Sequence, residues 1–321
     1  MVLYLFGRVT GIGVVFVIVS ILAFVLMHSV PGGPFDETNN PLNAEGKANI
    51  LRKYGLDRPM YEQYFNYMGS ALHGDFGISY QSPTESVLQL IGRAWPTSMQ
   101  LGGMAILLAF TVGLTSGILA AVHQNTWIDY VVRAFSIAGV AMPSFWLGIL
   151  IILGILITSK AWFGSPWMPP IKYVPIWVDP FYNLSMLIWP ALATGYRYSA
   201  VATRMTRSAM LEVLREDYVR TARAKGVFQK LVIRRHALRN ALLPVITVIG
   251  IEFAFLMGGL VVTEQVFNLN GLGKLFVESV SNQDYNMTQA LVMLVVAIFA
   301  LANLFVDVLY AWIDPRIRYN P

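Results

Sequence analysis

The stretch from Glu216 to Pro244 reads EDYVRTARAKGVFQKLVIRRHALRNALLP and joins two apolar parts of the chain. Ten Lys and Arg side chains fall between Thr203 and Asn240: Arg204, Arg207, Arg215, Arg220, Arg223, Lys225, Lys230, Arg234, Arg235 and Arg239. Basic residues collect in the cytoplasmic connections of membrane proteins. The stretch therefore predicts a cytoplasmic loop, residues 202–240, between two membrane spans.

Composition supports a membrane protein. Of the 321 residues, 56% are hydrophobic and only 13% are charged, whereas soluble domains carry about 25% charged residues. The chain has no Cys, which excludes disulfides and thiolate metal sites, and its four His residues are scattered without metal-ligand spacing. The net charge of +5 lies beside apolar segments, so membrane topology and lipid headgroups explain it better than nucleic acid does.

Six segments are long and apolar enough to cross a bilayer, which needs about 20 residues per helix. They are Val9–Val30, Thr97–Val122, Arg133–Ile157, Leu184–Val201, Ala241–Thr263 and Met287–Trp312. The first has a longer apolar run than a signal peptide and no small-residue cleavage site before Pro31, so we interpret it as a retained span. The expected fold is an all-α integral membrane protein with six transmembrane helices.

The distribution of positive charge predicts the orientation of these spans. Arg8, Arg133, the ten basic residues above, Arg316 and Arg318 fall on one side. The basic residues of the other side lie mostly in one long segment, and long segments count little in the positive-inside rule. Both termini are therefore expected in the cytoplasm, and residues 31–96, 158–183 and 264–286 are expected outside.

The external segment 31–96 predicts two short helices, Ala44–Tyr54 and Met60–Leu72. Their apolar residues are too few for an independent core, so we expect the segment to pack on the outer ends of the spans. With no internal repeat, the chain is expected to form a single transmembrane domain, 1–321.

The cytoplasmic loop contains a further short helix. Glu216 and Asp217 favour a helix start because acidic groups interact with the positive end of the backbone dipole, and Gly226 is a natural C-terminal residue. Small residues at Ala222, Ala224 and Gly226 would let another surface approach closely. Two interpretations stay open: a solvated loop that obeys the positive-inside rule, and a docking helix.

Ionisable groups within the spans are a second candidate site. Glu252 and Arg197 differ in predicted depth by roughly 5 Å, at 1.5 Å of rise per residue. Such groups usually face a partner or a wet cavity, so the two either line a pathway or form a fixed ion pair. Asp307 is expected near a helix end. Pro96 suits a first helical turn, and Pro143 and Pro190 can each kink a span.

Several motifs resemble those of peptide-type ABC importer permeases. DYVRTARAKG followed by RRHALRNALLPV is similar to the family's loop signature, with Arg220, Thr221 and Ala222 at its E-A-A positions and Gly226 at its glycine. Further similar stretches are HSVPGGPF, YGLDRPMYEQYFNYM, HGDFGISY, MPSFWLG, TEQVFNLNGLGKLF and VDVLYAWIDPRIRY. The leading Glu of the signature is missing, and Asn270 replaces a common Pro. The resemblance covers nearly the whole chain and fits the first-permease subunit of dipeptide and oligopeptide importers.

The resemblance implies an ABC type I importer permease fold in a bacterial inner membrane. It implies four kinds of partner: a second homologous permease, two ATPase subunits, an extracytoplasmic peptide-binding protein and a peptide substrate. The residues implied to couple the chain to an ATPase are Asp217, Tyr218, Arg220, Thr221, Ala222, Arg223, Ala224 and Gly226. The chain itself is expected to need no cofactor, with ATP and Mg bound by the partner ATPases, because Gly273-Lys274 lacks the remainder of a phosphate loop.

Other functions remain as alternatives. A nickel importer permease belongs to the same family. A secondary transporter driven by an ion gradient would need intramembrane proton or sodium sites, for which Glu252 and Asp307 are the acidic candidates. A structural membrane scaffold is a third alternative. The secondary transporter would leave the DYVRTARAKG loop unexplained.

Overall fold

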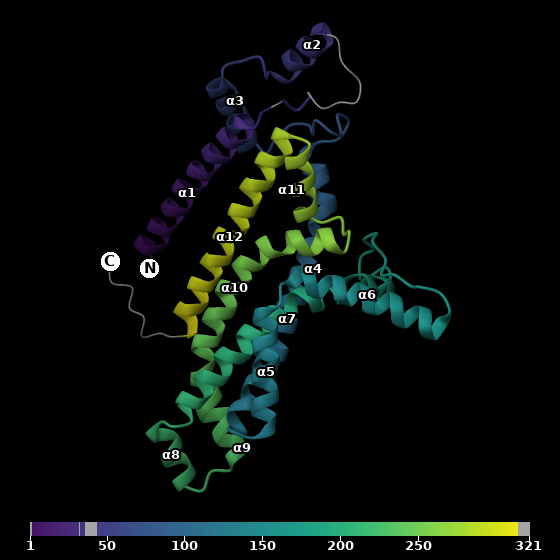
Figure 1. The fold of residues 1–321 in the computed structure, drawn as a ribbon. Helices are drawn as coiled ribbons and strands as arrows, with labels where there is room; N and C mark the ends of the chain where they lie inside the picture. Colours follow the sequence, from purple (N-terminus) through teal and green to yellow (C-terminus); the bar gives the residue numbers. More distant parts are fainter. Residues whose placement is uncertain (1, 32, 36–43, 314–321) are drawn as a thin grey trace. The chain divides into compact units, whose positions relative to one another are not determined.

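The computed structural model describes residues 2–31, 33–35 and 44–313. Within these ranges the secondary structure is helical apart from an isolated β-bridge between Ile78 and Ser86. The chain divides into two compact units, and Figure 1 labels the helices that they contain. Unit 1 comprises Met1–Pro96 and Gly271–Ala300, and unit 2 comprises Thr97–Asn270 and Leu301–Arg318, as far as these ranges are described.

Unit 1 combines helices from both ends of the sequence. They are α1 (Val2–Ser29), α2 (Ala44–Tyr54), α3 (Met60–Leu72), the start of α4 (Val87–Val122), α11 (Leu272–Ser281) and the first part of α12 (Tyr285–Ile313). The bounds of α2 and α3 confirm the two short helices predicted in the external segment. The core of the unit consists of Val87, Ile91, Ala94, Leu272, Met287, Ala290 and Leu291.

Hydrogen bonds attach segment 31–96 to the long helices of unit 1. The hydroxyl groups of Ser20 in α1 and Tyr64 in α3 lie 2.8 Å apart. Asp284, next to the start of α12, accepts hydrogen bonds from the Ser79 hydroxyl at 2.5 Å and the Tyr80 backbone N–H at 2.9 Å. These contacts confirm that segment 31–96 packs on the ends of α1 and α12.

Unit 2 is arranged around one long helix, α7 (Pro180–Val213), which contacts α5 (Trp127–Ala141), α6 (Ser144–Phe163) and α10 (Leu238–Val266). Its remaining helices are the rest of α4, α8 (Asp217–Ala224), α9 (Gln229–Leu231), the π-helix η1 (Val232–Ala237) and the last part of α12. Asp179 caps α7 by accepting a hydrogen bond from the Tyr182 backbone N–H at 3.0 Å. This satisfies one of the free N–H groups of the first turn.

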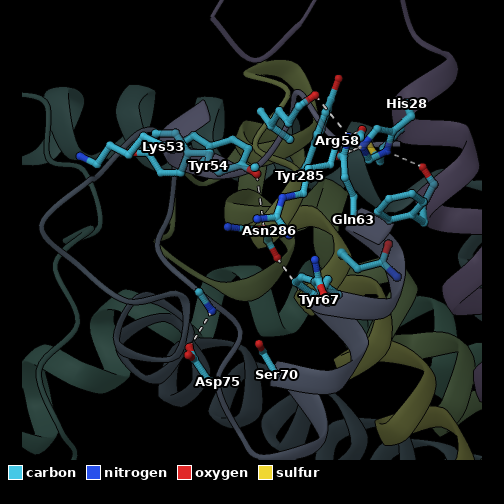
Figure 2. Close-up of a pocket in the computed structure, with 18 of the residues that line it drawn as sticks. His28, Lys53, Tyr54, Arg58, Gln63, Tyr67, Ser70, Asp75, Tyr285 and Asn286 are labelled. Carbon is cyan, nitrogen blue, oxygen red and sulfur yellow. Dashed lines mark hydrogen bonds between the residues drawn. The ribbon is translucent and has the colours of Figure 1, made fainter. Parts of the chain in front are cut away.

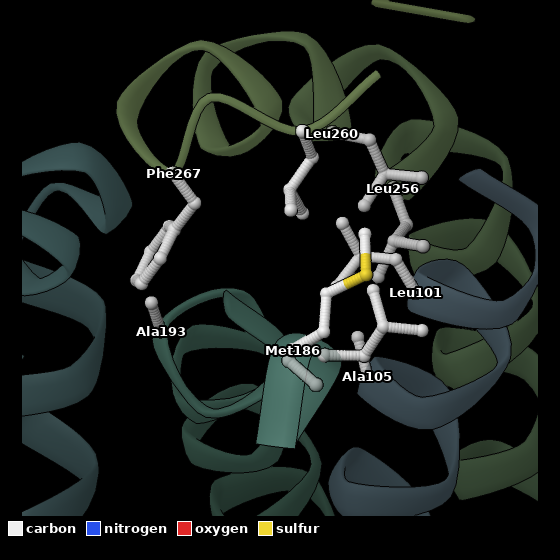
Figure 3. Close-up of a cluster of buried hydrophobic side chains, with 10 residues drawn as sticks. Leu101, Ala105, Met186, Ala193, Leu256, Leu260 and Phe267 are labelled. Atoms are coloured by element: carbon white, nitrogen blue, oxygen red, sulfur yellow. The ribbon is translucent and has the colours of Figure 1, made fainter. Parts of the chain in front are cut away.

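Buried apolar side chains from α4, α7 and α10 form the core of unit 2. Figure 3 shows Leu101 and Ala105 of α4, Met186 of α7, and Leu256 and Leu260 of α10 gathered in one cluster. Leu101 and Met186 are at most 1% exposed. The three helices therefore pack directly against one another at this cluster.

Four of the described helical stretches are long and apolar enough to cross a membrane: Thr10–Ser29, Val87–Val122, Ser144–Phe163 and Tyr285–Leu304. The predicted spans Leu184–Val201 and Ala241–Thr263 lie inside the long helices α7 and α10. The helical, multi-span character of the fold is thus as predicted.

The predicted third span, Arg133–Ile157, is wrong as one continuous helix. The structure divides it into α5, which ends at Ala141, and α6, which begins at Ser144. Pro143 disfavours helical geometry at the residue before it, and Met142 accordingly has an extended ψ of 127°.

The prediction for Pro96 is also wrong. α4 begins at Val87, so Pro96 lies inside this helix rather than in its first turn. Pro190 likewise lies within the continuous α7.

Candidate functional site

The short helix predicted in the basic loop is present as α8. It begins at Asp217 after the N-cap residue Glu216 and ends at Ala224, as the acidic start signal predicted. The chain then turns at Gly226, whose φ of +75° lies in the left-handed region that glycine adopts without strain. Residues 214–216 alone separate α8 from the long helix α7.

One face of α8 packs against the rest of its own loop. Val219 is fully buried and Ala222 is 7% exposed, and both lie in a small cluster with Val232 of η1. A side-chain hydrogen bond of 2.7 Å from Asn240 Nδ2 in α10 to the Tyr218 hydroxyl adds a polar contact. α8 is thus held to η1 and α10 as well as to the end of α7.

The opposite face of α8 is exposed. It presents Asp217, Arg220, Thr221 and Ala224. Arg223 lies one turn after Val219, at the edge of the packed face, and is exposed, as are Lys225 and Gly226 after the helix. Arg220 and Asp217 form a loose ion pair at 3.5 Å on this surface. The exposed residues of α8 and of the turn after it are therefore mainly basic, with small residues at the C-terminal end.

The structure corrects the prediction for Ala222. The sequence grouped it with Ala224 and Gly226 as a small-residue surface, but a helix places residues 222 and 224 on different faces. Ala222 is buried inside the loop, while Ala224 and Gly226 are exposed. Ala222 therefore contributes to the position of α8 rather than to its accessible surface.

Sequence reasoning missed Phe228, which follows the turn at Gly226. Its side chain is 84% exposed, next to the basic face of α8. The available signal was an aromatic residue within an otherwise charged loop. A cavity of about 290 Å³ also lies in this region, and Leu214, Arg215, Arg223 and Gln229 are among the residues that line it.

A buried ion pair joins α5 to α7 close to this region. The Asp129 carboxylate is fully buried and accepts hydrogen bonds from Arg207 Nε at 2.7 Å and Nη2 at 2.8 Å. The backbone N–H of Asn125 donates a further bond to it at 3.0 Å. These bonds to Arg207, with a smaller contribution from Asn125, lower the pKa of Asp129 to about 2. This contact was not predicted either.

The two charges predicted within the membrane are not joined by an ion pair. Within the part of the chain that the structure describes, no salt bridge links Glu252 to Arg197. Arg197 is exposed on α7, and Glu252 is partly buried on α10. The side chain of Asp307 lies outside the described side chains, as do residues Arg316 and Arg318.

Two family descriptions match the chain. Residues 113–319 match "Binding-protein-dependent transport system inner membrane component". Residues 1–102 match the N-terminal part of the membrane components of binding-protein-dependent transport systems. Together they cover nearly the full sequence.

Individual proteins are similar over the same length. The chain is 38% identical over 318 residues to the glutathione transport system permease protein GsiC of Escherichia coli strain K12, with 99% of each chain covered. The protein of the same name from Shigella flexneri serotype 5b gives the same identity and coverage.

Solved structures show the same fold. A crystal form of the MetNI methionine ABC transporter in an inward-facing conformation superposes with a TM-score of 0.55 and 16% identity, covering 71% of this chain and 97% of the other. A second crystal form of that transporter gives a TM-score of 0.52 with 70% and 97% coverage.

Proposed function

Because the chain belongs to the inner-membrane components of binding-protein-dependent transport systems, and is a permease subunit of an ATP-driven ABC importer, we propose that it carries short peptides. The family resemblance that the loop motif predicted is confirmed. The chain is a multi-pass protein of the inner membrane, and ATP is hydrolysed on a partner subunit. The proposal of a peptide substrate is supported by full-length similarity to relatives named for glutathione, itself a small peptide.

We further propose the composition and orientation of the assembly. A second homologous permease completes the pathway, two ATPase subunits bind on the cytoplasmic side, and an external peptide-binding protein delivers substrate. Both termini and the loop 202–240 face the cytoplasm. The cluster of basic residues in that loop supports this orientation.

In this proposal the exposed face of α8 is the surface that contacts an ATPase. Two observations support the role. The exposed residues of α8 and of the turn after it include Arg220, Arg223 and Lys225 beside the small residues Ala224 and Gly226, which allow close approach. The helix is also held at its other face by Val219 and Ala222, so a force on α8 is transmitted to η1, α10 and α7 rather than absorbed by a loose loop.

A substitution at Ala224 tests the docking surface. Ala224→Trp adds a large side chain to the exposed face, and we expect it to abolish co-purification of the ATPase subunits and ATP-dependent uptake. Ala161→Trp is the matched control, because Ala161 is an exposed alanine on α6, remote in sequence from the loop. If Ala224→Trp still co-purified with the ATPase subunits and still supported ATP-dependent uptake, docking through this face would be contradicted.

Uptake by the reconstituted importer tests the substrate. The complex is placed in liposomes with its binding protein and ATP, and accumulation of radiolabelled trialanine is measured. We expect saturable uptake that stops without ATP. Accumulation of methionine or Ni²⁺ in place of trialanine would remove the peptide proposal and leave the permease assignment intact.

The pathway proposal concerns Glu252 and Arg197. Neither is tied to the other by an ion pair in the described structure, so both charges are free to face water, substrate or the second permease. Because uncompensated charges in a membrane segment require a polar surrounding, we assign them to the wall of the translocation pathway.

A further inference from the structure

Unit 1 contains an open cavity of about 420 Å³. Its lining comes from α1, the turn between α2 and α3, α3 itself, the loop at residues 75–80, and the start of α12. Figure 2 shows His28, Arg58, Tyr67, Tyr285 and Asn286 around this space. The volume is within the range of roughly 300–1,000 Å³ that is typical of small-molecule sites.

The walls of this cavity are held in place by their own contacts. His28 Nε2 lies 3.2 Å from Gln63 Oε1, and the Gln63 amide donates a hydrogen bond of 2.8 Å to the Arg58 carbonyl. The His28 ring also packs against Phe24 and Tyr285, with ring centroids 4.1 and 4.5 Å apart. The cavity therefore needs little rearrangement to receive a ligand.

The tyrosines Tyr67 and Tyr80, which also line the cavity, remain neutral hydrogen-bonding groups. Burial, followed by nearby groups that include the Asp284 carboxylate, raises the pKa of Tyr67 and of Tyr80. The Tyr67 hydroxyl reaches the Asn286 carbonyl at 3.4 Å. Tyrosine and amide groups thus offer both donors and acceptors to a polar ligand.

The charges at the rim are unbalanced. Arg52, Lys53 and Arg58 line the cavity together with one carboxylate, Asp75. Among the residues that the structure describes, no carboxylate lies within 4.0 Å of the charged groups of Arg52 or Arg58. Asp75 accepts a bond of 2.9 Å from the Gly77 backbone N–H. An anionic ligand would supply the missing partner, because guanidinium groups bind carboxylates in a bidentate manner.

We propose that this cavity binds a short peptide, with its C-terminal carboxylate on Arg52 and Arg58 and its N-terminal ammonium toward Asp75. The tyrosine and amide groups between them would bind the peptide backbone. This inference rests on the proposed peptide substrate and adds a receiving site in the external segment, before the membrane pathway. A cavity of about 420 Å³ suits a small ligand better than the broad surface of a protein.

Direct binding to the complete importer, purified in nanodiscs without its binding protein, tests the site. The probes are trialanine and trialanine amide, and the dissociation constant is measured by equilibrium dialysis. We expect Arg58→Gln to weaken trialanine binding about tenfold, and the amide to bind about tenfold more weakly than the acid, the ratio that corresponds to one charge-assisted contact. Arg93→Gln is the control, because exposed Arg93 pairs with Glu85 at 2.6 Å and does not line the cavity.

A second variant tests the other end of the peptide. Asp75→Asn keeps an oxygen for the Gly77 N–H but removes the charge. We expect it to weaken binding of trialanine severalfold and to leave binding of N-acetyl-trialanine unchanged, because the acetylated peptide has no ammonium group to lose.

The contrary results are distinct from failure of the proposed function. Equal binding of trialanine by wild type and Arg58→Gln, or no saturable binding at all, would overturn the inference even if peptide uptake is intact. Arg58→Gln could instead alter the stimulation of ATPase activity by the loaded binding protein while leaving the binding of free trialanine unchanged. That result would identify the cavity as a protein docking surface and would also overturn the inference.

Discussion

Asp129 shows how one buried charge can fix the position of two helices. Its carboxylate is fully buried and is satisfied by Arg207 on α7 and by the backbone of Asn125. The same bonds raise the pKa of Arg207 and lower that of Asp129 to about 2. The pair lies between α5 and the helix that leads into α8, so it stabilises the base from which α8 projects.

Removing this charge should destabilise the protein. Asp129→Asn leaves Arg207 without its ionic partner, and we expect a loss of about 3 kcal/mol, typical of breaking a buried pair. Because the folded pKa is below the unfolded value of about 4, the stabilisation is present above pH 4 and is lost as the pH falls toward 2. Thermal unfolding in detergent should show a gap between wild type and variant at pH 7 that narrows below pH 4. A gap independent of pH would contradict the ionic origin.

Glu252 is a partly buried carboxylate on α10. If it lines the pathway, Glu252→Gln should change the transport rate or the range of peptides accepted, with little change in thermal stability. Measured uptake of neutral, acidic and basic tripeptides checks this outcome. An unchanged rate and range would end the pathway interpretation of this residue.

The crossing of α4 and α7 decides how unit 2 packs. The sequence GLTSG at 113–117 places two glycines one helical turn apart, and both face α7. A Cβ on Gly113 would lie 2.4 Å from the Cβ of Ala202, and one on Gly117 would lie 2.5 Å from the Cβ of Thr206. The GxxxG spacing was visible in the sequence and is typical of close helix contacts in membranes.

Substitution in this crossing should separate the two helices. We expect Gly117→Val to destabilise the protein by about 2 kcal/mol, the usual effect of overpacking. Gly103→Val is the matched control on the same helix, because no atom lies within 4 Å of a Cβ at Gly103. The measurement compares the melting temperatures of purified Gly117→Val and Gly103→Val with that of the wild type. Equal effects would show that helix propensity, not packing, is responsible.

At the scale of the whole molecule, segments far apart in the sequence make each unit. Unit 1 joins the first 96 residues to residues 271–300. Asp284 provides the clearest example, since it accepts bonds from Ser79 and Tyr80, which are 205 and 204 positions away. The arrangement also gives the external segment a fixed attachment to α12, and with it a cavity that no single segment could form.

The absence of Cys makes the orientation directly testable. Thr84→Cys and Thr221→Cys place single thiols at exposed positions in the external segment and in α8. With a membrane-impermeant maleimide on intact spheroplasts, we expect labelling at residue 84 and none at residue 221 until the membrane is opened. Labelling of residue 221 in intact spheroplasts would reverse the proposed topology.

The sequence by itself determined the features that depend on local chemistry. Apolar length predicted membrane helices, the acidic start at Glu216-Asp217 and the glycine at 226 predicted α8, and the loop motif identified the family. The bounds of the third span were wrong because they were taken from hydropathy alone, although Pro143 was recognised as a possible kink. The break at Pro143 divides a run that hydropathy alone reads as continuous, since hydropathy does not register a missing backbone donor.

Only the tertiary structure decided which side chains meet. It turned Ala222 toward Val219 and Val232, paired Asp129 with Arg207, and gathered Arg52, Arg58 and Asp75 around one cavity. Periodicity assigns a residue to a face of its helix but does not say what that face will contact. Contacts between distant segments depend on the simultaneous packing of several helices, which is why the candidate sites, unlike the fold class, could be completed only in three dimensions.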